Sequence, residues 1–158
     1  MRLRVLRQED AELMLEWMHD PCVVANLQTN FSSKTIEDCK SFIAAAQNDE
    51  TNLHMAIADD EDTYMGTVSL KHIRDGVAEF AITVRAVAMG KGYAKYGMRE
   101  MLEYGMTQLM LERIYWCVSK ENHRAVRFYD KNGYIRTTEV PESLRQGYSK
   151  DLLWYVNC

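Results

Sequence analysis

The sequence predicts an α/β (α+β) fold in which helices cover both faces of a mixed, mostly antiparallel central sheet. Asp75-Gly76 joins two strand-like runs and is a strong signal for a hairpin turn. Apolar residues then recur at helical spacing over about 92–110, and an apolar run at 113–118 is followed by a capped helix at 122–131. No linker rich in Pro, Gly or Ser interrupts these patterns, so we expect the 158 residues to form a single domain, 1–158.

The N-terminal part is expected to form one short strand and two helices. Residues 3–7 alternate between apolar and polar side chains, as a half-buried strand does. The segment 8–10 places acidic residues at the positive end of a helix, which His19-Asp20-Pro21 ends. A second helix is predicted over 35–47, after the serines at 32–33.

The strands after these helices are expected to build most of the sheet. Their apolar runs are bounded by turn residues, and the acidic stretch 59–62 is interpreted as a solvated turn between the first two. Asn132-Gly133 is expected to end the last long helix. The predicted strands cover 52–58, 64–73, 77–84 and 113–118, and two closing strands cover 134–138 and 151–156.

Composition argues against several classes of function. A formal net charge of −4 disfavours broad binding to nucleic acid or to anionic membranes. The four cysteines and the four histidines lack the paired spacing of a disulfide framework or a zinc site, so we expect reduced thiols and no metal. Residues 1–4 lead straight into a polar segment, and no apolar run approaches the ~20 residues of a membrane span. We therefore expect a cytoplasmic location.

A glycine-bearing turn at 84–94 is the strongest functional signal. Gly90 and Gly92 lie between an apolar strand and the start of the long helix, where backbone N–H groups can bind phosphate or pyrophosphate. A dinucleotide-binding fingerprint would need a small residue in place of Lys95, and a Walker A loop would need glycine in place of Arg85. Taken alone, the turn is equally consistent with a tight strand-to-helix connection.

A second motif lies downstream, from 122 to 134. Asn122 is a natural N-cap, Ala125 allows close packing, and Gly133 ends the helix before an aromatic residue starts the next strand. In order, the two segments resemble the GNAT superfamily of acyl-CoA-dependent N-acetyltransferases. That family's pyrophosphate loop reads Gln/Arg-x-x-Gly-x-Gly/Ala, and its later segment reads Asn-x-x-Ala, an aromatic-Tyr pair and Gly-Phe/Tyr. The resemblance covers essentially the whole chain in element order and implies the GNAT fold.

The resemblance also implies a binding site for acetyl-CoA, the expected cosubstrate. The loop would hold the pyrophosphate through backbone N–H groups, while the preceding strand edge and Asn122 would contact the pantetheine arm. Met89 departs from the family pattern, which has Gln or Arg there, but a grip made by the backbone is expected to keep CoA binding. The implied cofactor-binding residues are Ile82, Thr83, Val84, Met89, Gly90, Lys91, Gly92, Tyr93, Ala94 and Asn122.

Acetyl transfer to an amine needs a base for the amine, a donor for the oxyanion and an acid for the leaving thiolate. The resemblance implies that Tyr129 faces the thioester sulfur as the general acid; the alternative is an aromatic residue that only packs. Glu79 is the candidate base, acting through water, and the alternative is a solvated strand carboxylate. The backbone N–H near Val84 is the candidate oxyanion donor, and no covalent nucleophile is required.

We therefore expect an N-acetyltransferase in which the acceptor amine attacks acetyl-CoA directly in a ternary complex. The opening residues resemble the branch that contains ribosomal-protein N-terminal acetyltransferases. The expected acceptors, in order, are a small-molecule amine such as an amino sugar or amino acid, a protein N-terminus and a polyamine. Trp17 and the segments 26–31 and 139–148 are candidates for the acceptor pocket.

Two other interpretations remain open. A non-catalytic CoA-binding sensor is favoured by Met89 and disfavoured by Tyr129, and a nicotinamide-binding enzyme is disfavoured by Lys95. The exposed edge of the C-terminal strands is a candidate surface for a homodimer.

Overall fold

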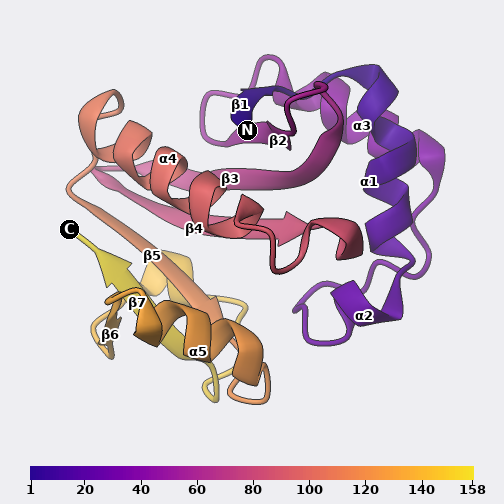
Figure 1. The fold of residues 1–158 in the computed structure, drawn as a ribbon. Coiled ribbons are helices and arrows are strands. Elements are labelled where there is room, and N and C mark those ends of the chain that lie inside the picture. Colours follow the sequence, from indigo (N-terminus) through magenta and orange to yellow (C-terminus); the bar gives the residue numbers. More distant parts are fainter.

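The computed structural model describes residues 1–158 and is built on one seven-stranded sheet, ordered β1-β2-β3-β4-β5-β7-β6 (Figure 1). Every neighbouring pair is antiparallel except β4 and β5, which are parallel. The mixed, mostly antiparallel sheet predicted from the sequence is thus confirmed. The strands are β1 (Arg2–Val5), β2 (Leu53–Ala58), β3 (Tyr64–Arg74), β4 (Val77–Val84), β5 (Arg113–Val118), β6 (Ile135–Thr137) and β7 (Leu153–Asn157).

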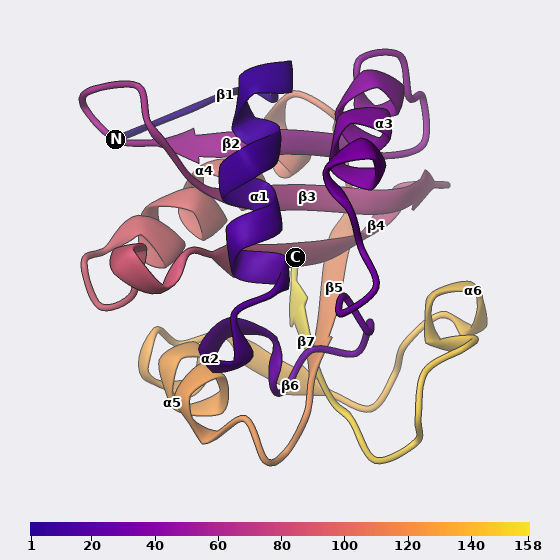
Figure 2. The same ribbon diagram turned by 90° about the vertical axis from the view of Figure 1, so that its right-hand side faces the viewer.

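Helices cover both faces of this sheet, as Figures 1 and 2 show. On one face, α1 and α3 pack over β2 and β3; on the other, α4 lies across β3 and β4, and α5 packs over β5 and β7. No helix is both long enough and apolar enough to span a bilayer. The helices are α1 (Ala11–Met18), α2 (Pro21–Val24), α3 (Ile36–Ala46), α4 (Tyr93–Thr107), α5 (His123–Lys131) and α6 (Glu142–Arg145), with short 3₁₀ turns at Gln8–Asp10 and Ala86–Ala88.

Alternation along the strands divides the apolar side chains between two core clusters. On β2, for example, Ile57 enters the cluster under α4 whereas its neighbour Ala56 enters the cluster under α1 and α3. Adjacent residues of a strand point to opposite faces, so a sheet covered on both sides must be apolar at most positions. This explains why the central strands read as nearly continuous apolar runs in the sequence.

The parallel pair β4 and β5 is joined along only part of its length. Val77–Glu79 pair with Arg113–Tyr115, and beyond these residues the two strands separate (Figure 1). On its other edge β4 stays paired with β3 up to its end, where the Arg85 N–H donates to the Met65 carbonyl oxygen at 2.8 Å. In an antiparallel pair, successive residues alternate between hydrogen-bonding to the partner strand and facing away from it. Because Arg85 bonds to β3, the other odd-numbered residues of β4 also direct their backbone groups to β3. The backbone groups of Ile82 and Val84 therefore face the gap, whereas the Phe80 N–H still belongs to the pairing with β5.

Two helix predictions were wrong in detail. Pro21, which was expected only to end the first helix, occupies the first turn of the additional helix α2, and the Asp20 side chain caps that helix by accepting from the Cys22 N–H at 2.9 Å. Proline suits this position because its missing N–H would have no partner there. The helix predicted to reach 110 ends at Thr107, because Met110 takes a left-handed conformation, with φ of 55°, that turns the chain toward β5.

The acidic turn 59–62 was expected to be solvated, and for Asp62 this was wrong. Its carboxylate forms ion pairs with the guanidinium groups of Arg2, Arg4 and Arg7. Arg4 also forms a two-pronged ion pair with the buried Asp10, at 2.8 and 2.9 Å. These hydrogen bonds from arginine lower the pKa of Asp62 well below its usual range. The turn therefore ties β1 to the β2–β3 connection.

Candidate active site

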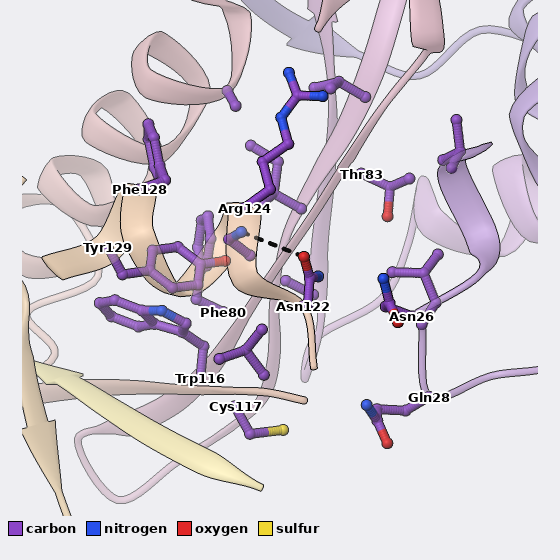
Figure 3. A pocket seen from close by; sticks show the side chains of 18 of the residues that line it. Asn26, Gln28, Phe80, Thr83, Trp116, Cys117, Asn122, Arg124, Phe128 and Tyr129 are labelled. Atoms are coloured by element: carbon purple, nitrogen blue, oxygen red, sulfur yellow. Dashed lines mark hydrogen bonds between the residues drawn. The ribbon is translucent and has the colours of Figure 1, made fainter. Parts of the chain in front are cut away.

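A cavity of about 560 Å³ opens where β4 and β5 separate, and its size is typical of a small-molecule site. The strand β4 forms one wall, the start of α5 another, and the segment that follows α2 a third (Figure 3). The turn between β4 and α4 closes one end. Segments far apart in the chain therefore meet at a gap that the sheet itself creates.

The glycine turn lies at the cavity with the conformation that its sequence suggested. Gly90 and Gly92 have φ of 75° and 89°, in the left-handed region that favours glycine, and Gly92 is the N-cap of α4. The N–H groups of the first turn of α4 have no partner within the helix and carry its positive end. Met89 and Ala94 also line the cavity, whereas Lys91 and Tyr93 do not.

Asn122 combines a structural position with access to the cavity. Its side-chain oxygen accepts a hydrogen bond from the Ala125 N–H at 3.3 Å, which confirms its predicted role as the N-cap of α5 (Figure 3). The same side chain lines the cavity, as do Ile82, Thr83 and Val84 on the opposite wall. The cavity thus brings together the strand edge and the start of α5.

Tyr129 lies on α5 beneath the cavity floor. Only 9% of the residue is exposed, and its ring lies 5.6 Å from that of Trp116 and 5.0 Å from that of Tyr155, measured between centroids. Figure 3 shows the phenol pointing toward the centre of the cavity, near Asn122. Burial raises the pKa of the Tyr129 phenol far above its usual value, so the hydroxyl stays protonated at neutral pH. The residue therefore both packs in the core and presents a proton donor to the cavity.

Glu79 is not a solvated carboxylate, contrary to the alternative considered from the sequence: it is 3% exposed on β4. One carboxylate oxygen, Oε2, accepts from the Tyr148 hydroxyl at 2.5 Å and lies 3.5 Å from the Lys71 Nζ. The other, Oε1, is buried and has no hydrogen-bond partner, with the His72 imidazole 3.9 Å away. A buried acceptor without a partner is costly, and such groups mark places where a ligand or a proton can be received.

Sequence reasoning missed the contact between Tyr148 and Glu79. Tyr148 was only one residue of the segment 139–148, and no local pattern signals a hydrogen bond across 69 residues. Burial, followed by the hydrogen bond to Glu79, raises the pKa of Tyr148, so this phenol also stays protonated. Cys117 lines the cavity nearby, and burial raises the pKa of its thiol to about 12, which leaves it a poor nucleophile.

The remaining wall comes from the segment after α2. Asn26 and Gln28 present amide groups to the cavity (Figure 3), and Phe31 lines it as well. Trp17, which was predicted to shape this wall, does not reach it. Its ring is buried under α1, where the indole N–H donates to the Tyr64 hydroxyl at 2.9 Å and the ring contacts Phe31.

The separated parallel strands, the glycine turn and the capped helix define the class of protein: an acyl-CoA-dependent N-acyltransferase fold. The family model of the acetyltransferase (GNAT) domain matches residues 1–135, so the chain belongs to the GNAT acetyltransferase family. Acetyl-CoA is the cosubstrate of that family, as the resemblance implied.

Several known proteins are similar to this chain. A spermidine N(1)-acetyltransferase of Escherichia coli K12 is 27% identical over 136 residues, which cover 84% of this chain and 67% of the relative. One from Vibrio cholerae is 30% identical over 97 residues, covering 60% of this chain and 56% of the relative, so the aligned part spans little more than half of that enzyme. Acetyltransferase PseH of Campylobacter jejuni (NCTC 11168) is 22% identical over 93% of both chains.

The fold is shared with a solved structure. The crystal structure of spermidine N-acetyltransferase from Vibrio cholerae in complex with CoA and spermine has a TM-score of 0.83 and 21% sequence identity, and covers 99% of this chain and 94% of that one. At this identity the likeness shows the fold.

Proposed function

We propose that this protein transfers the acetyl group of acetyl-CoA to a primary amine of a small molecule, and that a polyamine of the spermidine type is the leading acceptor. The observation that carries the proposal is a single cleft with the glycine turn at one end and the buried Glu79 carboxylate in its wall. The names of the relatives favour a polyamine over the amino sugar or amino acid that the sequence put first.

The cosubstrate fits the groups that line the cleft. The unpaired backbone groups of Ile82 and Val84 would hydrogen-bond the amides of the pantetheine arm, as an added strand would. Thr83 would contribute through its side chain rather than its backbone, since its backbone groups are used on β3. The N–H groups of Gly90 and of residues 92–94 would receive the pyrophosphate, since those of Met89 and Lys91 already donate to the carbonyl oxygens of Ala86 and Ala88. Acetyl-CoA then supplies an activated acetyl group next to Tyr129.

The two buried side chains would divide the proton transfers. The amine nitrogen attacks the thioester carbonyl carbon, so a C–N bond forms and the C–S bond breaks. Glu79 receives the proton of the amine at Oε1, directly or through water, because Oε2 is held by Tyr148. Tyr129 donates its proton to the leaving thiolate, and burial keeps the phenol protonated until the C–S bond breaks.

A specific observation favours a second acceptor class, an amine with uncharged polar groups such as an amino sugar. Glu79 is the one carboxylate that lines the cavity, whereas Asn26, Gln28 and Thr29 offer amides and a hydroxyl. A polyamine places several positive charges in its site, and each buried charge needs a partner. The acceptor panel must therefore contain both classes.

The test is to incubate the purified protein with acetyl-CoA and each acceptor, and to measure thiol release and product mass. Spermidine, spermine, glucosamine, an amino acid and an N-terminal peptide form the panel. Faster thiol release with spermidine supports the leading acceptor, and faster release with glucosamine supports the second.

Binding without turnover would instead indicate the CoA sensor. A ligand at ~100 times its dissociation constant stabilises a protein by ~2.7 kcal/mol, so a thermal shift detects binding separately. Absence of any shift with acetyl-CoA contradicts the proposal. Dimerisation through the edge strand β6 stays a prediction, to be tested by solution mass measurement.

A further inference from the structure

Arg124 lies on the first turn of α5 and reaches across the mouth of the cavity to the glycine turn. Its Nη1 lies 3.4 Å from the Met89 Sδ, and its Nη2 lies 3.9 Å from the position that a Cβ would take on Gly90. Figure 3 shows its side chain extended away from Asn122. The guanidinium is therefore held directly over the turn that ends β4.

The charge of Arg124 is not neutralised by the protein. Its hydrogen-bond acceptor is a thioether sulfur, which is a weak one, and no carboxylate lies within ion-pair distance. Arg85 and Arg99, in contrast, form ion pairs with Glu16 and Glu100. A guanidinium with five N–H donors and no anionic partner, placed at a cavity, is suited to an anionic ligand.

Three further sources of positive potential converge on the same point. The α4 helix is 15 residues long and begins at the turn, so its positive end faces the ligand. The left-handed conformations of Gly90 and Gly92 expose backbone N–H groups beside it. The Lys95 side chain lines the cavity one turn further on. These groups define a place for the phosphate groups of CoA rather than for its apolar arm.

We propose that the Arg124 guanidinium binds the pyrophosphate of CoA and replaces the polar side chain that the loop lacks at Met89. The inference rests on the proposed acetyl-CoA site. The turn presents a thioether where a Gln or Arg side chain is expected, and the sulfur itself is the contact that positions Arg124. The cation for the pyrophosphate is thus supplied by α5 and not by the loop.

The test compares Arg124→Gln with a matched control, Arg127→Gln, on the same helix. Arg127 is also exposed but does not line the cavity. Dissociation constants are measured by calorimetry for CoA and dephospho-CoA, and by competition for pantetheine. We expect Arg124→Gln to weaken CoA and dephospho-CoA equally, by about 10- to 30-fold, and to leave pantetheine unchanged. Arg127→Gln is expected to change none of the three.

Each other outcome overturns the proposal in a recognisable way. Weakening of CoA alone would place Arg124 on the 3′-phosphate, and equal weakening of pantetheine would indicate a structural role in the cleft. Unchanged affinities would show that Arg124 binds nothing. If the unmodified protein binds no CoA, the proposed function itself fails, and the inference fails with it.

A second variant tests the replacement directly. Met89→Arg restores a cation within the loop, so it should recover most of the CoA affinity lost in Arg124→Gln but add little to the unmodified protein. The effects of the two substitutions on CoA affinity should therefore be non-additive, as expected for two side chains that bind the same phosphate. Equal effects of Met89→Arg in both backgrounds would contradict the proposed replacement.

Discussion

The two ends of the cleft are built in different ways. The end assigned to CoA consists mainly of backbone: the free edge of β4, the glycine turn and the start of α4. The acceptor end consists of side chains from separate loops, such as Asn26, Gln28 and Tyr148. A backbone site tolerates a change such as Met89 because the N–H groups remain, whereas a side-chain site changes its specificity with each substitution. Substitutions are therefore expected to change the choice of acceptor more readily than the binding of the cosubstrate.

The largest effect on turnover is expected at Tyr129, which lies between the CoA end and the acceptor end of the cleft. Tyr129→Phe removes the proton donor and leaves the ring packing intact, so kcat should fall by about 10²–10⁴-fold while acetyl-CoA affinity is kept. Tyr134→Phe is the matched control, since its ring also contacts Trp116, at 5.2 Å, but does not line the cavity. Steady-state kinetics and calorimetry distinguish the two variants. An unchanged kcat in Tyr129→Phe would contradict the role of Tyr129 as general acid and would show that the residue only packs in the core.

Glu79→Gln should affect the acceptor end and spare the CoA end. The amide keeps the shape but cannot take a proton, so kcat/KM for the amine should fall by about 100-fold at unchanged CoA affinity. Tyr148→Phe should have a smaller effect, about tenfold, because it removes only the hydrogen bond that holds Oε2. Equal losses in the two variants would contradict the role of Glu79 as the base, since positioning alone would then explain both.

The CoA end can be tested by a substitution that acts on the backbone. Gly90→Ala forces a Cβ onto a residue with φ of 75°, so the turn should shift and CoA affinity should fall by about tenfold. Gly133→Ala is the control: φ is 80° there, nothing lies within 4 Å of the added Cβ, and the site is remote from the cavity. Both variants should lower the midpoint of thermal unfolding, but only Gly90→Ala should weaken CoA. Unchanged CoA affinity in Gly90→Ala would contradict the view that the backbone of the glycine turn binds CoA.

The smallest effects are expected from single side chains of the acceptor wall. Gln28→Ala should raise KM for the acceptor by about 2- to 10-fold, the value of one neutral hydrogen bond, and leave KM for acetyl-CoA unchanged. Asn26→Ala provides the matched substitution two residues away, and the two together report which amide contacts the acceptor. A change in KM for acetyl-CoA would show that the two ends are not separate.

Local sequence patterns predicted the seven strands and the four longer helices, and they indicated the glycine turn, whereas the short helices α2 and α6 were not predicted. Strands β4 and β5 have the predicted bounds, and Asn122 caps α5 as expected. Turn chemistry, caps and apolar periodicity act over a few residues, so the sequence displays them directly. The GNAT motifs are of this kind as well.

The burial of Glu79, its hydrogen bond to Tyr148 and the position of Arg124 over Met89 became visible in the folded structure alone. The same holds for the position of β7 between β5 and β6, and for the separation of β4 and β5 beyond Glu79. Each of these features depends on segments tens of residues apart. Their contacts form through packing of the whole sheet, which no local pattern records, and the acceptor end of the cleft is made almost entirely of such contacts.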